Sequence, residues 1–119
     1  MNDIIIKASL FRVFISPLAF LEYSKDFYSA STSYNSENPF SPATYYLICR
    51  SIELSMKAYL LTEGVCRDQL KKRLSHNLKK ILKKSKELGL LSIVSIADEE
   101  QIHIAKANKW YVKKRFEYF

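Results

Sequence analysis

The sequence predicts an all-α fold, and three observations favour it. The chain has only two glycines and three prolines in 119 residues, which leaves little material for the tight turns of a β-rich fold. Apolar residues recur at helical spacing in several segments. Residues 41–64 are also predicted to form one long helix, with a start signal at Ser41 and an end signal at Gly64. A chain of this length suits one domain with its own core.

The first 15 residues mix apolar and charged positions and leave three interpretations open: a short strand, an extra helical turn or an N-terminal arm. Residues 16–119 are predicted to form a single domain. Charged residues interrupt the early apolar run, so we expect no secretory signal, and no stretch approaches the ~18–20 apolar residues of a membrane span. We expect Cys49 and Cys66 to be reduced thiols of a cytoplasmic protein.

Ser16 and Pro17 predict the start of the first helix, since serine is a good N-cap and proline suits the first helical position. Phe20, Tyr23 and Phe27 fall on one face of this helix, which is expected to end at about Ala30. Residues 31–40 are rich in Ser, Asn and Pro and predict a loop. Because this loop is short, the helices on either side of it are expected to lie antiparallel.

The long helix repeats the same start at Ser41 and is expected to end at Gly64. Its apolar residues form two neighbouring stripes, so it needs partners on more than one side. Its polar strip is narrow and consists of Arg50, Glu53 and Lys57, which are spaced so that neighbours face each other one turn apart. The preferred interpretation is an intrahelical ladder of charges in solvent. The alternative is a polar seam between subunits or a ligand site.

Residues 67–74 are expected to hold one or two helical turns. A further helix is predicted to begin at residues 75–77 and to end at Gly89, with apolar residues on one face and lysines on the other. A last helix is predicted to begin with the acidic residues 98–100, where negative charge is favourable. The predicted inner face of this helix consists of Ile102, Ala105, Val112 and Phe116. Its predicted outer, basic stripe consists of Lys106, Lys109, Lys113 and Lys114.

The net charge of +7 is concentrated in one segment. Residues 67–86 contain nine basic residues and one acidic residue, which leaves the rest of the chain slightly negative. A patch of one sign suits a polyanion such as RNA, whereas the alternative is the solvated side of an amphipathic helix. The predicted nucleic-acid-binding residues are Lys71, Lys72, Arg73, Lys79, Lys80, Lys83, Lys84 and Lys86. The aromatic residues Tyr45, Tyr46, Trp110 and Tyr111 are interpreted as core residues, with base stacking as the alternative.

Motif spacing excludes several kinds of site. Neither His76 nor His103 lies one helical turn from a second His or Cys, so no metal site is expected. The two glycines are isolated, so no glycine-rich phosphate loop is present and no cofactor is implied. His76 remains the candidate for chemistry. It either caps its helix or fixes the incoming loop, or it acts as a general acid or base whose pKa is lowered by nearby positive charge.

Three blocks of the sequence resemble the HEPN superfamily of small helical-bundle proteins, above all its uncharacterised bacterial members. The blocks are YYLICRSIELSMKAYLLTEGV at residues 45–65, SHNL at 75–78 followed by ELGL at 87–90, and ANKWYVKKRFEY at 107–118. Together with the first helix, the resemblance covers residues 16–118. Its most specific part is the pattern E-L-x-x-K-A-x-L, which here runs from Glu53 to Leu60.

The resemblance implies a four- to five-helix up-and-down bundle, commonly a homodimer, found in toxin–antitoxin and defence systems and often partnered with a nucleotidyltransferase. Active members are metal-independent endoribonucleases whose motif is an Arg, four to six residues of any kind, and then a His. In this chain Arg67 precedes His76 by too many residues and Arg73 by too few.

These observations predict a non-catalytic or regulatory domain that binds RNA or another polyanion through its lysine-rich helix. One alternative is a divergent endoribonuclease, whose site combines Arg50, Glu53 and His76. A second alternative is a protein-interaction scaffold whose lysine face docks an acidic partner.

Overall fold

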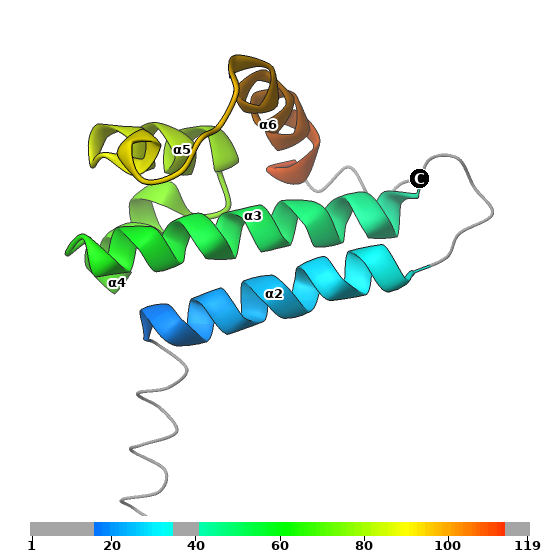
Figure 1. Cartoon of the computed structure of the whole chain (residues 1–119), viewed down its shortest axis with the longest axis horizontal. Coiled ribbons are helices and arrows are strands. Elements are labelled where there is room, and N and C mark those ends of the chain that lie inside the picture. The colour runs from blue at the N-terminus through cyan, green and yellow to red at the C-terminus, as the bar shows by residue number, and fades with distance from the viewer. Residues whose placement is uncertain (1–15, 35–40, 114–119) are drawn as a thin grey trace, which may run out of the picture.

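The computed structural model describes residues 16–34 and 41–113, and in these ranges the protein is an all-α helical bundle (Figure 1). The helices are α2 (Pro17–Ser33), α3 (Pro42–Thr62), α4 (Arg67–Gln69), α5 (Leu78–Glu87) and α6 (Asp98–Tyr111), with a π-helical turn at Leu70–Leu74 and a 3-10 turn at Leu90–Ser92. The predicted fold class is confirmed. The expectations for residues 1–15, for Lys114 and for Phe116 lie outside the described residues.

Serine caps start the first two helices as the sequence predicts. The Ser16 hydroxyl accepts from the Ala19 N–H at 3.1 Å, and the Ser41 hydroxyl accepts from the Thr44 N–H at 3.3 Å. Helix α2 continues three residues beyond the predicted end at Ala30. The Ser31 and Thr32 hydroxyls donate to backbone carbonyls three residues earlier in the same helix, so these polar side chains are satisfied without a loop.

Helix α3 lies in the middle of the molecule (Figure 1). Helix α2 runs antiparallel to it on one side, whereas α5 and α6 cover the other side, so both apolar stripes of α3 have partners. On the α2 side, the Ser24 hydroxyl donates to the Ser51 carbonyl at 2.8 Å and the Ser51 hydroxyl donates to the Ser24 carbonyl at 2.9 Å. These reciprocal bonds join the two helices through small side chains.

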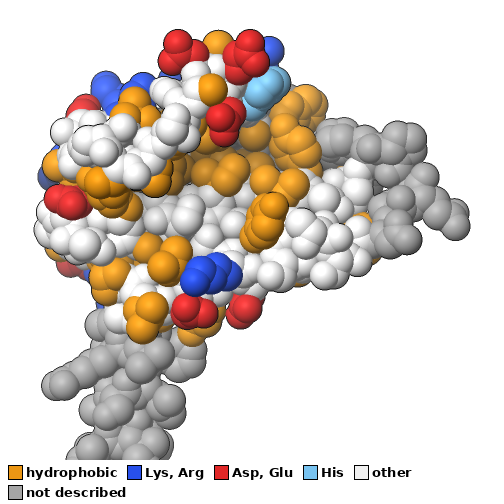
Figure 2. Space-filling view, viewed as in Figure 1, with side chains coloured by type: hydrophobic (Ala, Val, Ile, Leu, Met, Phe, Trp, Pro, Cys, Tyr) orange, Lys and Arg blue, Asp and Glu red, His pale blue; other side chains and the backbone are white. Residues whose placement is uncertain are grey.

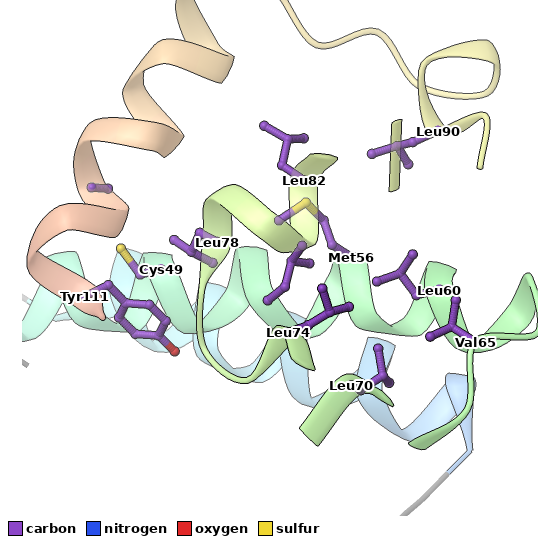
Figure 3. Close-up of a cluster of buried hydrophobic side chains, with 12 residues drawn as sticks. Cys49, Met56, Leu60, Val65, Leu70, Leu74, Leu78, Leu82, Leu90 and Tyr111 are labelled. Carbon is purple, nitrogen blue, oxygen red and sulfur yellow. The ribbon is translucent and has the colours of Figure 1, made fainter. Parts of the chain in front are cut away.

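The core lies between α3, the π-helical turn, α5 and α6 (Figure 3). Its buried members are Cys49, Met56, Leu60, Val65, Leu70, Leu74, Leu78, Ile81, Leu82, Leu90, Ala107 and Tyr111. Gly64 and Gly89 have φ angles of 92° and 96°, which confirms both as the left-handed residues that follow a helix. Both cysteines are free, Cys49 in the core and Cys66 at the surface. Within the described residues, no helix is long and apolar enough to cross a bilayer.

The predicted inner face of α6 is wrong. Ile102 and Val112 are 53% and 44% exposed, and Ala105 is half-buried. The buried residues of α6 are instead Ala107, Asn108 and Tyr111. The apolar pattern misleads because the side of α6 that faces the bundle carries hydrogen-bonding groups. That side therefore does not stand out as an apolar stripe.

Candidate functional site

The polar strip of α3 faces inward. Glu53 is only 1% exposed, the side chain of Lys57 is 9% exposed, and that of Arg50 is 27% exposed. The predicted ladder of charges in solvent is therefore wrong. The strip is covered by residues of the same chain, because α6 places Tyr111 against Glu53 and the turn before α5 brings in His76.

Four side chains converge on the carboxylate of Glu53. Its Oε2 atom accepts from Lys57 Nζ at 2.8 Å and from Arg50 Nη1 at 3.1 Å. Its Oε1 atom accepts from the Tyr111 hydroxyl at 2.6 Å. His76 Nδ1 lies 3.0 Å from Oε1 and 2.9 Å from Oε2. The Glu53 cluster, defined as Arg50, Glu53, Lys57, His76 and Tyr111, thus ties α3 to the turn before α5 and to α6.

The partners of Glu53 set its ionisation. Burial by itself raises the pKa of Glu53, but the hydrogen bonds from Lys57 and Tyr111, with the charges of Lys57 and Arg50, bring its pKa below the usual value. Burial and the same carboxylate raise the pKa of Tyr111 above its usual range. Burial and the Glu53 charge also raise the pKa of the Cys49 thiol to about 11. At neutral pH the cluster therefore holds a carboxylate and a protonated tyrosine.

These protonation states define the tautomer of His76. An ionised carboxylate only accepts hydrogen bonds, so Nδ1 of His76 must carry the hydrogen that faces Glu53. Arg50 Nη1 also lies 3.3 Å from Nδ1, but a guanidinium only donates, so this contact is not a hydrogen bond in that tautomer. When the ring is neutral, the second ring nitrogen, Nε2, is then an acceptor. A carboxylate that holds a histidine in this way leaves the other nitrogen able to take up a proton.

A pocket of about 440 Å³ lies beside the cluster. Its lining residues are Phe20, Arg50, Glu53, Leu54, Lys57, Arg67, Leu70, Lys71, Ser75 and His76. Four of them are cationic and one is a carboxylate, so the pocket is positive overall. Phe20, Leu54 and Leu70 add apolar surface. A pocket of this size and composition suits a ligand that carries both a negative charge and an apolar part.

The backbone that carries His76 is unusual. The π-helical turn Leu70–Leu74 ends at Ser75, which has φ 48° and ψ −127°. A positive φ is strained for a residue with a Cβ atom, and such strain clusters at functional sites. Asn77, and not His76, is the N-cap of α5, because its side chain accepts from the Lys80 N–H at 3.1 Å. The His76 side chain instead joins the incoming turn to Glu53.

The structure brings together Arg50, Glu53 and His76, the residues of the divergent-nuclease alternative. It does not bring the whole predicted basic patch to them. Lys71 lines the pocket, whereas the exposed residues Lys72, Arg73, Lys79, Lys80, Lys83 and Lys86 and the half-buried Lys84 are not among its lining residues. In the view of Figure 2, basic side chains appear along the upper edge above α5, and acidic ones gather at the start of α6.

Sequence reasoning missed two residues that complete the site. Tyr111 is a core aromatic, as the sequence predicts, but the sequence does not show that its hydroxyl donates to Glu53, which is 58 residues away. Asn108, one turn earlier on α6, accepts from the Leu78 N–H at 2.7 Å and donates to Asn77 at 3.0 Å. No spacing rule within one helix links these residues to the cluster. The one available signal was an Asn and a Tyr three residues apart, on one face of a helix.

In comparisons with known proteins, no family model, no curated protein and no solved structure matches this chain. Within residues 16–34 and 41–113, no group of three or more His, Cys, Asp or Glu side chains could hold a metal ion. What the site does must therefore be inferred from its own geometry.

Proposed function

We propose that this chain binds RNA at the pocket beside Glu53 and cleaves it with its own side chains, His76 acting as the general base. The observation that carries the proposal is the pairing of Glu53 with His76 at a pocket lined by four cationic residues. The carboxylate orients the ring, and the cations suit a phosphate. The cations that would bind a phosphate and the histidine that would transfer a proton therefore lie at the same pocket.

The reaction that fits these groups is attack by the neighbouring ribose hydroxyl. Nε2 of His76 takes the proton from a 2′-hydroxyl, and the resulting alkoxide attacks the adjacent phosphorus. The bond to the 5′-oxygen breaks, that oxygen takes a proton from water, and a 2′,3′-cyclic phosphate forms. Arg50 and Lys71 stabilise the negative charge that builds up on the phosphoryl oxygens.

The test is the cleavage of an end-labelled RNA in EDTA, followed by gel electrophoresis and by fluorescence anisotropy. We expect His76→Ala to lower the cleavage rate by about 10²–10⁴-fold while RNA affinity stays nearly unchanged. His103→Ala is the matched control, because His103 is exposed on α6 and does not line the pocket. Cleavage by His76→Ala at the parent rate would exclude His76 as the base.

A second candidate function is binding of RNA without cleavage, through the lysine face of α5. It is favoured by the exposure of Lys79, Lys80 and Lys83, which lie opposite the buried face of that helix. Reversing the charge of Lys79, Lys80, Lys83 and Lys84 to glutamate should abolish RNA binding under this function. Parent binding should weaken steeply with salt, because lysines displace counterions from phosphates. Unchanged affinity of the variant would contradict it and leave the face to an acidic protein partner.

The wider setting is part of the proposal and is supported only by the sequence resemblance. It comprises membership of the HEPN superfamily, a homodimeric state, a nucleotidyltransferase partner, and a role in a toxin–antitoxin or defence system. Sedimentation velocity of the purified chain tests the dimer directly. A single species with the mass of one chain across the micromolar range would contradict the dimer.

A further inference from the structure

We propose that α6 positions the catalytic histidine: Tyr111, acting through Glu53, holds His76 in the tautomer that leaves Nε2 as an acceptor. Asn108 of the same helix fixes the backbone of the turn that carries His76. Tyr111 and Asn108 are positioning residues, since neither lines the pocket. The catalytic consequence rests on the proposed function, whereas the tautomer follows from the hydrogen bonds alone.

The two oxygens of Glu53 have unequal sets of donors. Oε2 accepts from Lys57 and Arg50, both on α3, and also faces His76. Among the described residues, Oε1 faces only His76 and Tyr111. The Tyr111 hydroxyl is therefore the donor that holds Oε1, while Lys57 and Arg50 hold Oε2. It keeps the carboxylate oriented so that both oxygens face Nδ1 of His76. Without its hydroxyl, the carboxylate is free to rotate towards Lys57 and Arg50.

Tyr111 is also well placed to act as a fixed donor. It is 5% exposed, and its ring lies edge-on to the His76 ring, with centroids 6.4 Å apart and an interplanar angle of 82°. The ring of Tyr46 also packs against the Tyr111 ring, with centroids 5.7 Å apart. Because burial and Glu53 both raise the pKa of Tyr111, it remains a donor across the physiological pH range.

Asn108 secures the same turn from its other end. Its Oδ1 accepts from the Leu78 N–H, and its Nδ2 donates to Asn77 Oδ1, the atom that caps α5. The two residues that follow His76 are thus both bound to α6. On the preceding side, the Ser75 N–H donates to the Leu70 carbonyl at 2.7 Å. The backbone around His76 therefore has little freedom as long as α6 is docked.

The test is the tautomer of His76 measured by long-range ¹H–¹⁵N NMR. The chain has two histidines, so a His103→Gln background leaves His76 as the sole signal. We expect the neutral His76 ring of the parent to show the Nδ1–H tautomer. Tyr111→Phe keeps the ring and removes the donor, and should give a mixture with the Nε2–H tautomer. Tyr46→Phe is the matched control, because Tyr46 packs on the Tyr111 ring without lining the pocket, and should leave the tautomer unchanged.

A second variant covers the case in which Tyr111→Phe fails to fold. Asn108→Asp keeps the acceptor for the Leu78 N–H but loses the donor to Asn77, so it should also shift His76 towards the mixed tautomer. A folded variant of either residue with the parent tautomer would overturn the inference.

The cleavage assay separates this inference from the proposed function. If RNA is cleaved, we expect Tyr111→Phe to lower kcat by about tenfold or more with little change in KM, because the base is misplaced and the pocket is intact. A rise in KM of about tenfold with kcat unchanged would overturn the positioning role. If RNA is not cleaved, the proposed function fails, while the NMR result still decides whether α6 sets the tautomer.

Discussion

The polar strip of α3 and the lysine face of α5 are both runs of charged residues, and the fold treats them in opposite ways. In α3, Glu53 is fully buried, and its hydrogen-bonding partners among the described residues lie within 3.1 Å. In α5, Lys79, Lys80 and Lys83 are exposed. A narrow charged strip on a helix that is apolar on its other faces is typical of burial. Charges that cover one broad face are typical of solvent exposure.

The difference has an energetic basis. A buried charge is tolerated only when several partners replace its lost hydration, and Glu53 has four such partners within residues 41–113. The α5 lysines keep their water and need no fixed partner. We therefore expect a single substitution in the polar strip of α3 to lower the free energy of unfolding. A substitution in the lysine face of α5 should change it little. Three predictions test this contrast.

The largest expected effect comes from Glu53→Ala. It leaves Lys57 and Arg50 without their carboxylate in a mostly buried site, so we expect a loss of about 3–5 kcal/mol in the free energy of unfolding. Lys83→Ala, on the exposed face of α5, should change it by no more than about 0.5 kcal/mol. Urea unfolding at pH 7 measures both. Similar losses for the two variants would remove the contrast between the regions.

The second effect is a pH dependence confined to the first region. The folded-state pKa of Glu53 lies below its unfolded value of about 4.3, so its contribution is complete above that pH and is lost as the pH falls through the folded value. The stability gap between the parent and Glu53→Gln should therefore be widest near neutral pH and should shrink below about pH 4. Urea midpoints from pH 7 to pH 3 measure the gap. A gap that stays constant over this range would mean that Glu53 does not ionise in the fold as inferred.

The smallest effect concerns Ser75, at the junction between the two regions. Glycine accepts a positive φ without strain, so we expect Ser75→Gly to stabilise the protein by about 1 kcal/mol or less. Ser55→Gly, inside α3, should instead destabilise it by about 0.5–1 kcal/mol. Thermal unfolding followed by circular dichroism compares the two. A loss of stability in Ser75→Gly would show that the Ser75 backbone is not strained.

The parts of the fold that depend on near neighbours could be predicted from the sequence. The caps at Ser16 and Ser41 and the helix ends at Gly64 and Gly89 involve residues three or four positions apart, and all four are confirmed. The spacing of Arg50, Glu53 and Lys57 placed the polar strip, and His76 was already a candidate. Whether these residues meet depends on how α5 and α6 pack. That packing could not be read from the pattern, because the apolar residues Ile102 and Val112 turned out to be exposed.

Helix α2 buries a smaller share of its residues than α3 and α5 do. Its buried residues are Ala19, Ser24 and Ser31, all of them small. We expect its amide protons to exchange with deuterium through local opening, at a lower free energy than those of α3 and α5. Because Phe20 of α2 lines the pocket, each opening would remove one wall while the Glu53 cluster stays closed. Under the proposed function, local opening of α2 would give a long RNA a way into the pocket while the groups of the Glu53 cluster stay in place.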